Sequence, residues 1–269
     1  MRSLFLLACL ALAGCNCGPG GAGDPDGGKD GGGRGGGTGT GGGTGAGGGT
    51  GTGGGFGAGD DGGCVPGIVA TMRDFQDTHP DFEHFLGAKT GIVQTQLGAG
   101  KKPVYGPPTG TPVVTSGQAN FDQWYRDVPG VNITLQKSFA LTQSTPGHFV
   151  YDNSAFFPLD GEGFGNQGRN HNFHFTTEIH ASFVYKGGEV FTFRGDDDVF
   201  VFVNGRLALD LGGVHGAETG TVDFDGQAGQ LGISRGNTYD LDVFHAERHT
   251  TESNFRIETT IDCLVPIIN

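Results

Sequence analysis

Three adjacent carboxylates stand immediately before an apolar run in the second half of the chain. Asp196, Asp197 and Asp198 precede residues 199–203, in which valine and phenylalanine alternate. Like charges placed side by side disfavour one another's ionisation unless a cation neutralises them. Ca²⁺ accepts several carboxylate and carbonyl oxygens in a flexible geometry, whereas Mg²⁺ usually keeps more of its water. The triplet therefore predicts a calcium site, and charge alone leaves open a solvated acidic turn.

The run that follows the triplet predicts where these carboxylates lie. Valines occupy one face of a strand over residues 199–203 and phenylalanines the other, so both faces are expected to be buried. The aspartates would then lie in a loop that leads into a central strand. Loops at the end of a rigid sandwich are common places for binding sites.

Two histidine pairs raise the alternative of a zinc site. His245 and His249 are four residues apart, and His171 and His174 are three apart. Residues four apart on a strand lie about 13 Å apart, which is too far for one ion. A loop position for His249 weakens that objection for the first pair, but zinc also needs three or four ligands in a closed geometry. Hydrogen-bonded histidines are the favoured interpretation.

Two further chemical alternatives are weaker. Residues 160–166 alternate acidic and amide side chains in the manner of a calcium loop, but His171 stands where such a loop has its closing glutamate. A second cation there stays an alternative to a plain glycine-rich loop. Glycoside hydrolysis needs two carboxyl groups about 5–10 Å apart across a cleft, which three adjacent aspartates do not define. The chain is therefore not expected to be an enzyme.

The elements that must position the triplet are predicted to be strands. Alternating or apolar runs separated by Gly or Asn clusters predict strands over residues 131–135, 173–175, 183–185, 190–193, 199–203, 207–211, 222–224, 239–244 and 255–261. Asn204-Gly205 predicts a two-residue hairpin, and Gly187-Gly188 a second such turn. Two short helices are expected, over residues 80–85 and 120–126, the second capped by Asn120. The fold class is all-β, a β-sandwich or jelly-roll-like domain.

The first residues predict secretion. Arg2 precedes a short apolar stretch and then small residues before Cys15. This pattern also resembles the lipobox of bacterial lipoproteins, in which that cysteine is lipidated; an ordinary cleaved signal with a chance cysteine is the alternative. Residues 1–14 would be the signal peptide. Asn16 then favours the outer membrane, and so a bacterial cell surface, over the inner membrane.

A glycine-rich segment separates this signal from the part of the chain with normal complexity. It carries no hydrophobic pattern, so residues 15–63 predict a disordered tether behind the lipidated cysteine. Residues 64–269 are long enough for one all-β domain. The whole chain has a net charge of −13. An acidic chain repels nucleic acid phosphates and suits cations or neutral ligands better.

Two cysteines bracket the predicted domain. Cys64 and Cys263 stand near its two ends, and in an oxidising compartment they are expected to pair. A loop of that length would stabilise the fold by about 5 kcal/mol in the chain-entropy model. The alternative is that both stay free.

The motifs together resemble one known family. The stretches GDDDVFVFVNG (residues 195–205) and LDLGGVH (residues 209–215) closely resemble the fibro-slime domain of slime-mould and bacterial surface proteins. The resemblance continues through ATMRDF, HPDF, NFHFTTEIH and FHAERHTTESNF, which begin at residues 70, 79, 172 and 244. The family is a branch of the β-sandwich first named for the anthrax protective antigen, which also forms the ligand-binding head of yeast flocculins and related adhesins.

This resemblance implies a set of calcium ligands. In the adhesin branch, two consecutive aspartates joined by a cis peptide bond bind Ca²⁺, and the ion binds sugar hydroxyls. The matching pair here is Asp196 and Asp197. An asparagine from a later loop completes that site, for which Asn254 is the first choice and Glu252 the second. Asp198 falls where the wider family often has glycine and is given no role.

The same resemblance implies a function. Arg248 and His249 of the later loop are expected to contact the ligand together with the two aspartates. We expect a lipid-anchored surface protein whose calcium-dependent β-sandwich binds extracellular polysaccharide or matrix components in adhesion. The alternative is a structural matrix or slime protein in which calcium only stabilises the fold. In both cases the protein is expected to contact the membrane only through its lipid anchor.

Overall fold

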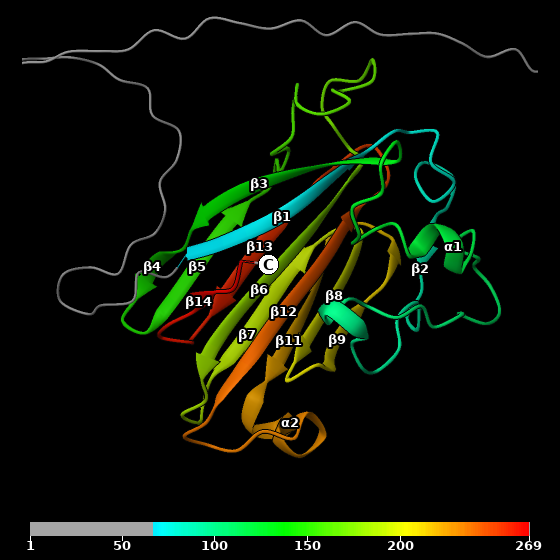
Figure 1. Cartoon of the computed structure of the whole chain (residues 1–269). Helices are drawn as coiled ribbons and strands as arrows, with labels where there is room; N and C mark the ends of the chain where they lie inside the picture. Colours follow the sequence, from blue (N-terminus) through cyan, green and yellow to red (C-terminus); the bar gives the residue numbers. More distant parts are fainter. Residues whose placement is uncertain (1–66, 269) are drawn as a thin grey trace, which may run out of the picture. The chain divides into compact units, whose positions relative to one another are not determined.

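The described part of the chain is built from antiparallel strands, as the sequence predicts. The computed structural model describes residues 67–268. Figure 1 shows the strands arranged in two main layers, with only short helices beside them. Within these residues no helix is both long enough and apolar enough to cross a membrane.

The larger sheet has seven strands. Its order is β3 (Asn132–Ala140), β1 (Gly67–Phe75), β6 (Phe175–Val184), β12 (Thr238–Glu247), β8 (Asp198–Val203) and β9 (Arg206–Leu211), and β14 (Val265–Pro266) also pairs with β6. Every residue of β8 is buried, which confirms that both faces of residues 199–203 are covered. The strand lies inside the sheet, next to the edge strand β9.

The smaller sheet packs on one face of the larger one. Its order is β11 (Glu218–Asp223), β7 (Val190–Gly195), β13 (Phe255–Thr259), β5 (His148–Asn153) and β4 (Thr142–Thr145). The valines of β8 and the inward side chains of β1, β6, β7, β12 and β13 form the main hydrophobic core between the two sheets. The fold is therefore a β-sandwich.

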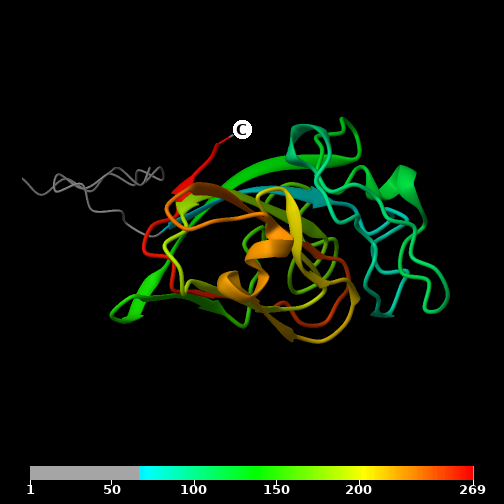
Figure 2. The same ribbon diagram turned by 90° about the horizontal axis from the view of Figure 1, so that it is seen from below.

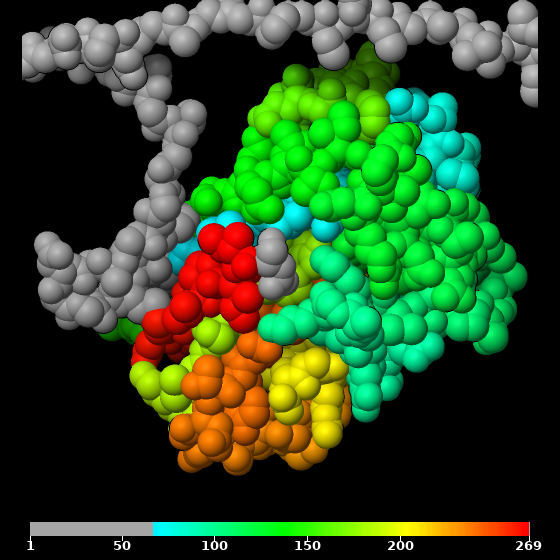
Figure 3. All heavy atoms as spheres, in the orientation of Figure 1, coloured from blue at the N-terminus to red at the C-terminus, as the bar shows by residue number. Residues whose placement is uncertain are grey.

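A second hydrophobic core lies on the other face of the larger sheet. Phe200 and Phe202 of β8 and Phe244 of β12 pack there against Trp124, Tyr125 and other apolar residues of the segment that follows β2 (Gly87–Ala88). That segment contains η1 (Ala99–Lys101) and α1 (Gln118–Phe121), and β2 pairs with β10 (Gly213–Val214). In Figure 3 its teal and green atoms cover the side of the molecule beside the yellow and orange strands. This irregular layer buries the phenylalanine face of β8.

One helix closes an end of the sandwich. α2 (Phe224–Leu231) buries Phe224 and Leu231 in the main core, and Asp223 caps its first turn by accepting from Gly226 N–H. Figure 2 shows this orange helix lying across the end of the two layers. It follows the end of β11 that pairs with Val190, so it lies at the opposite end of β7 from Gly195.

Several local predictions are corrected here. Residues 80–85 form turns and not a helix, because Glu83 has a positive φ of 63°. The second predicted helix is α1, which begins earlier than expected; its N-cap is Gly117, and Asn120 lies inside it. Residues 222–224 end β11 and begin α2, so the predicted strand there continues as a helix.

The two predicted glycine turns have different outcomes. Asn204 and Gly205 both have positive φ, 53° and 68°, and join β8 to β9 as the predicted hairpin. Gly187 and Gly188 also have positive φ, but they connect β6 to β7, which belong to different sheets. That turn is a crossover between layers.

Candidate calcium and ligand site

The acidic triplet lies at the junction of β7 and β8. Asp196 and Asp197 form the turn between these strands, and Asp198 is the first residue of β8. The three residues are only 3%, 4% and 0% exposed. This burial rules out the solvated acidic turn. Burying carboxylates is costly unless hydrogen bonds and opposite charges compensate it.

Asp196 is held by the loop that precedes β13. Its Oδ1 accepts a hydrogen bond from Asn254 N–H at 2.5 Å, and its Oδ2 accepts one from the Asn254 side-chain amide at 3.1 Å. The main-chain carbonyl of Asp196 pairs with His245 Nε2 at 2.7 Å. Burial lowers the pKa of His245, which favours a neutral ring that donates to this carbonyl. The structure thus brings the predicted pair Asp196 and Asn254 into direct contact.

Gly195 makes this approach possible. A Cβ at this position would lie 2.5 Å from the carbonyl oxygen of Asn254 and 2.6 Å from the ring of Phe193. The Asn254 carbonyl has little room to move, because the next residue, Phe255, pairs with Gly195 in the sheet. The absence of a side chain before the aspartates is therefore a structural requirement of the site.

Asp197 and Asp198 are held by different donors. Asp197 accepts from the main-chain N–H of His215 at 3.2 Å and of Arg248 at 2.9 Å. Asp198 accepts from Gly213 N–H at 2.6 Å and from Arg248 Nε at 2.6 Å. Asp198, for which no role was expected, is the buried partner of the Arg248 guanidinium.

Arg248 lies behind the site. Its side chain is fully buried and stacks on the ring of Trp124, with its Cζ 4.6 Å from the ring centroid. Nη1 donates to the main-chain carbonyls of Asp81 and Val114. The guanidinium thus ties the irregular layer to the triplet, in a position from which it holds the aspartates and does not face the pocket.

A fourth carboxylate belongs to the same cluster. Glu247, the last residue of β12, is fully buried, and neither of its carboxylate oxygens has a hydrogen bond of normal geometry within residues 67–268. Burial, and then the charges of Asp197 and Asp196, raise the pKa of Glu247 well above its usual range. Sequence reasoning missed this residue. The available signal was its spacing of two from the inward-facing His245 on the same strand.

The cluster has more negative than positive charge. Four buried carboxylates (Asp196, Asp197, Asp198 and Glu247) face one buried guanidinium, so full ionisation would leave a net charge of −3. Burial raises the pKa of Asp197 to about 7, and Arg248 offsets only part of that increase. A buried site of this kind must either take up protons or bind a cation.

Asp196 and Asp197 open onto a pocket. The cavity has a volume of about 360 Å³, and its wall is completed by Leu86, Val214, His215, Gly216, His249, Thr250, Thr251 and Glu252. His249 and Glu252, both expected near the ligand, therefore lie on the pocket wall. Glu252 is exposed, whereas Asn254 is buried against Asp196. The pocket leaves room for water or a ligand beside the aspartate pair.

Part of the set of polar groups at the site matches the oxygen ligands that Ca²⁺ accepts. The carboxylates of Asp196 and Asp197 are hard oxygen ligands of the kind this ion accepts. The Asn254 amide directs its nitrogen at Asp196, so its carbonyl oxygen would reach an ion only after the amide turns over. The bond between Asp196 and Asp197 is trans, since Thr111–Pro112 is the cis peptide bond of the described residues. This differs from the adhesin branch. Here the β12–β13 connection donates to both carboxylates, through Asn254 to Asp196 and through Arg248 to Asp197, and His215 also donates to Asp197.

The other predicted sites do not assemble. Across residues 67–268 no group of three or more His, Cys, Asp or Glu side chains is arranged to hold a metal. The histidine pairs therefore form no zinc site, and the aspartate pair would need oxygens of other residues or of a ligand to hold an ion. His174 pairs with Glu83 at 2.8 Å and His171 with Asp160 at 2.6 Å. Asp160 also accepts a hydrogen bond from Asn172 N–H. Both of its carboxylate oxygens are therefore bonded to residues at the far end of the glycine-rich loop.

A short segment between α2 and β12 matches a hydrolase sequence motif. Residues 232–236 read Gly-x-Ser-x-Gly, the pattern of a nucleophile elbow. That elbow joins a strand to a helix, whereas Ser234 lies in the reverse connection, between α2 and β12. Ser234 contacts Tyr239 and Asn237, and no histidine hydrogen-bonds to it within the described part of the chain. The match carries no catalytic arrangement.

The predictions for the first 66 residues lie outside the described residues. They are the signal peptide, the lipidation of Cys15, the glycine-rich tether and the pairing partner Cys64. Cys263 lies between β13 and β14. Its pairing with Cys64 stays a prediction.

Part of the chain matches a known protein family. Residues 157–263, which include the triplet and the Asn254 loop, match the family model of the PA14 domain. The chain is similar to Protein psiQ of Dictyostelium discoideum, with 40% identity over 209 residues that cover 72% of this chain and 20% of that protein. It is also 40% identical to Protein psiD of the same organism over 211 residues, which cover 72% of this chain and 41% of that protein.

These relatives are longer than the matched region. The chain spans between 20% and 41% of the length of the two curated proteins named above. Among solved structures it is similar to the "PA14 sugar-binding domain from RTX adhesin", with a TM-score of 0.34 and 10% sequence identity, covering 76% of this chain and 95% of that one.

Proposed function

We propose that this chain is a calcium-dependent binding module for extracellular glycan or matrix polymers, built on a PA14-type β-sandwich, and that it acts by binding and not by catalysis. One observation carries the proposal. Two buried aspartates with uncompensated negative charge line an open pocket at one end of the sandwich. A cation placed there would neutralise the pair and still face a ligand.

Each residue of the cluster has a role in this proposal. Asp196, Asp197 and Asn254 would hold the ion, and Glu247, whose raised pKa favours the protonated form in the metal-free chain, belongs to the same buried cluster. When bound, Ca²⁺ would supply open coordination positions for two hydroxyl groups of a sugar. Arg248 keeps the aspartates in place through its N–H and its guanidinium. It is thus a positioning residue in place of the ligand contact expected from the sequence.

The wall of the pocket supplies the remaining contacts. His249 and Glu252 and the hydroxyls of Thr250 and Thr251 can exchange hydrogen bonds with a polyol. Leu86 is 65% exposed and offers an apolar surface to the carbon face of a ring. The resemblance to fibro-slime proteins supports an extracellular polymer as the partner.

The predicted anchor fits the same proposal. A lipid on Cys15 and a glycine-rich tether would hold the sandwich away from a bacterial outer membrane, at the cell surface. The pocket would then face the surrounding matrix. Mass spectrometry of the membrane fraction tests this part, because a diacylated or triacylated N-terminal peptide should begin at Cys15.

Glycan-array binding tests the main proposal. Binding by the wild-type chain should require Ca²⁺, disappear in EDTA, and be lost in Asp196→Asn and Asp197→Asn. Asp225→Asn is the matched control, because Asp225 is a carboxylate at the α2 end that pairs with Arg235. Calcium-dependent binding that persists in both aspartate variants would refute the proposed site.

A second candidate function rests on the depth of the cluster. Glu247 and Asp198 are fully buried, so a cation could serve mainly to hold β7, β8 and β12 together in a structural matrix protein. Calorimetry separates the two functions. If Ca²⁺ raises the melting temperature but no saccharide adds heat or further stabilisation, the structural function is the correct one.

A further inference from the structure

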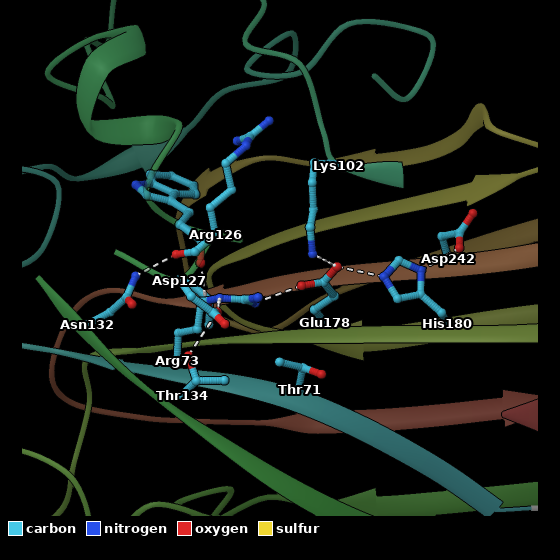
Figure 4. A network of polar contacts seen from close by, with 12 residues as sticks. Thr71, Arg73, Lys102, Arg126, Asp127, Asn132, Thr134, Glu178, His180 and Asp242 are labelled. Atoms are coloured by element: carbon cyan, nitrogen blue, oxygen red, sulfur yellow. Dashed lines mark hydrogen bonds and ion pairs between the residues drawn. The ribbon is translucent and has the colours of Figure 1, made fainter. Parts of the chain in front are cut away.

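A second polar cavity lies on the outer face of the larger sheet and shares no residue with the calcium pocket. Its volume is about 380 Å³. The lining residues are Thr71, Arg73, Lys102, Arg126, Asp127, Thr134, Gln136, Glu178 and His180. None of them is a hydrophobic residue. Figure 4 shows that the strands carry most of these side chains and that the loops with Lys102 and Arg126 project over them.

Strand register creates the floor of this cavity. Ala70 and Met72 of β1 point into the main core, so Thr71 and Arg73 point outward. Thr71 pairs across the sheet with Gln136 of β3 on one side and with Glu178 of β6 on the other. Three adjacent strands thus present polar side chains to the same place, on the face where the second hydrophobic core covers β8 and β12.

Glu178 organises the charges at the floor. It is 2% exposed, and it accepts from Arg73 Nη1 at 2.7 Å, from His180 Nε2 at 2.6 Å and from the Lys102 ammonium. Burial alone would raise its pKa, but His180, Arg73 and Lys102 together hold the pKa of Glu178 at about 2. Both of its oxygens are therefore ionised and already used, and they do not compete for a ligand.

Arg73 and Arg126 each have N–H groups that make no hydrogen bond within the described residues. Arg73 uses Nε for Asp127 at 2.8 Å and Nη1 for Glu178, and within residues 67–268 its Nη2 has no partner. Arg126 is partly exposed; its Nη1 donates to the carbonyl of Asp122, and its Nε and Nη2 have no partner in the same residues. These donors point to a planar anion, for which guanidinium is the preferred partner.

The balance of charge at the cavity wall is positive. Three basic side chains, Arg73, Lys102 and Arg126, line it against the carboxylates Asp127 and Glu178. His180 adds to the basic side: burial would lower its pKa, but the hydrogen bonds that its ring donates to Asp242 and Glu178 raise the pKa above its ordinary value. Asp242 lies behind the ring and does not line the cavity. Asp122 is a further carboxylate beside the wall, 3.7 Å from Nη1 of Arg126. The lining residues themselves still carry more basic than acidic groups, in a chain whose net charge is −13.

Neutral side chains beside these cations can bind hydroxyl groups. Gln136 Nε2 donates to Thr71 Oγ1 at 2.8 Å, which leaves the Thr71 hydroxyl hydrogen and the Gln136 carbonyl oxygen available. Thr134 donates to Asp127 at 2.8 Å and can still accept. An array of hydroxyl partners next to guanidinium groups that keep unused N–H donors matches a ligand that carries both hydroxyls and a carboxylate.

We propose that this cavity binds a carboxylated saccharide, such as a hexuronate unit of an acidic polysaccharide. The carboxylate would pair with Arg126 and with Nη2 of Arg73, and the ring hydroxyls with Thr71, Thr134 and Gln136. The site needs no calcium. It would give the module a second contact with an extracellular polymer, on the sheet face and away from the aspartate pocket.

The experiment titrates a hexuronate oligosaccharide into the full chain in EDTA, which silences the calcium pocket. Isothermal calorimetry and backbone amide NMR shifts are the readouts. The wild-type chain should bind, with shifts at Thr71, Thr134 and Gln136. Arg126→Gln should weaken binding by about tenfold, as loss of a charged hydrogen bond predicts. Lys102→Gln is a second variant, which lowers the positive charge without touching the carboxylate contact.

Matched ligands and a matched variant decide the result. Arg256→Gln is the control variant, because Arg256 is a similarly exposed arginine that pairs with Asp152 and Glu258 on the smaller sheet. It should bind as the wild type does. A neutral oligosaccharide of equal length and free acetate should both bind more weakly than the hexuronate oligosaccharide. Absence of hexuronate binding, equal binding of the neutral oligosaccharide, or binding unaffected by Arg126→Gln would each overturn the proposal, whatever the calcium pocket does.

Discussion

Asn254 satisfies both carboxylate oxygens of Asp196, one with its main-chain N–H at 2.5 Å and the other with its side-chain amide at 3.1 Å. The two residues are 58 positions apart in the sequence. The contact joins the β7–β8 turn to the loop before β13, which also supplies His249 and Glu252 to the pocket wall. The hydrogen bonds between Asn254 and Asp196 therefore hold the aspartate pair against the loop that forms part of the pocket wall.

Calcium should stabilise the fold through this pair. A ligand that binds only the native state at ten times its Kd stabilises by about 1.4 kcal/mol, so the melting temperature should rise with Ca²⁺. An exposed extracellular site predicts a Kd on the order of 10⁻⁴ to 10⁻³ M. Thermal unfolding should show this increase in the wild type and in Asp225→Asn, but not in Asp197→Asn. An equal increase in Asp197→Asn would place the ion elsewhere.

Without calcium, Asp197 should make stability depend on pH. Its pKa is about 7 in the folded chain against 3.8 for the ordinary side chain. Since the folded state holds the proton more tightly, the stabilisation is complete below pH 4 and is lost as the pH rises through 7. In EDTA the wild type should lose on the order of 2–4 kcal/mol over this range relative to Asp197→Asn.

Urea denaturation at a series of pH values measures this difference, and the variant serves as the baseline because it removes one titrating group. The charge of Asp197 raises the pKa of Glu247, so Glu247 titrates differently in the variant and the comparison reports the coupled pair of carboxyl groups. A free-energy difference that does not change between pH 4 and pH 7 would show that Asp197 does not titrate abnormally. Saturating Ca²⁺ should reduce the pH dependence, since a bound cation favours the ionised carboxylate.

Arg248 and Asp198 should be strongly coupled. Each is fully buried, and Nε of the arginine lies 2.6 Å from Oδ2 of the aspartate. Replacing one partner leaves the other charge buried and alone, so Arg248→Met should cost about 3–5 kcal/mol. Asp198→Asn in the same chain should recover part of this loss, and a double-mutant cycle in urea measures the coupling. Additive costs would mean that the pair does not act as a unit.

Gly195 should tolerate no side chain. In Gly195→Ala the new Cβ would lie 2.5 Å from the Asn254 carbonyl, so the chain should lose about 1–3 kcal/mol and bind calcium more weakly. Gly229→Ala is the control, because nothing lies within 4 Å of a Cβ there and the residue is inside α2. That variant should gain up to about 1 kcal/mol. Equal effects in the two variants would contradict the close approach at Asn254.

The sequence predicts the parts of this molecule that depend on local pattern. Strict alternation over residues 199–203 gives β8 with both faces covered, and Asn204-Gly205 gives the hairpin that follows it. Adjacency singles out the acidic triplet, and only the family resemblance selects Asp196 and Asp197 from it as the expected calcium pair. The helix α2 escaped prediction because Gly226 and Gly229 lower its helix propensity, and its stability comes from Phe224 and Leu231 in the core.

The remaining parts depend on strand order, which no local pattern shows. Glu247 belongs to the cluster only because β12 pairs with β8, so the end of one strand meets the start of the other. The contact between Arg73 and Glu178 spans 105 residues and exists because β1 lies beside β6. Arg248 illustrates the same limit. The family resemblance implied a ligand contact for Arg248, and only the packing of the irregular layer, with Trp124 against the guanidinium, shows that the side chain is buried.

A crystal structure of the calcium-soaked chain tests the central claim most directly. The account predicts one ion bonded to the carboxylates of Asp196 and Asp197 and to the side chain of Asn254, with at least two water-filled positions facing the pocket of His249 and Glu252. No ion at the pair under saturating Ca²⁺ would contradict the calcium site. An ion there whose positions are all filled by protein oxygens would contradict its use in ligand binding.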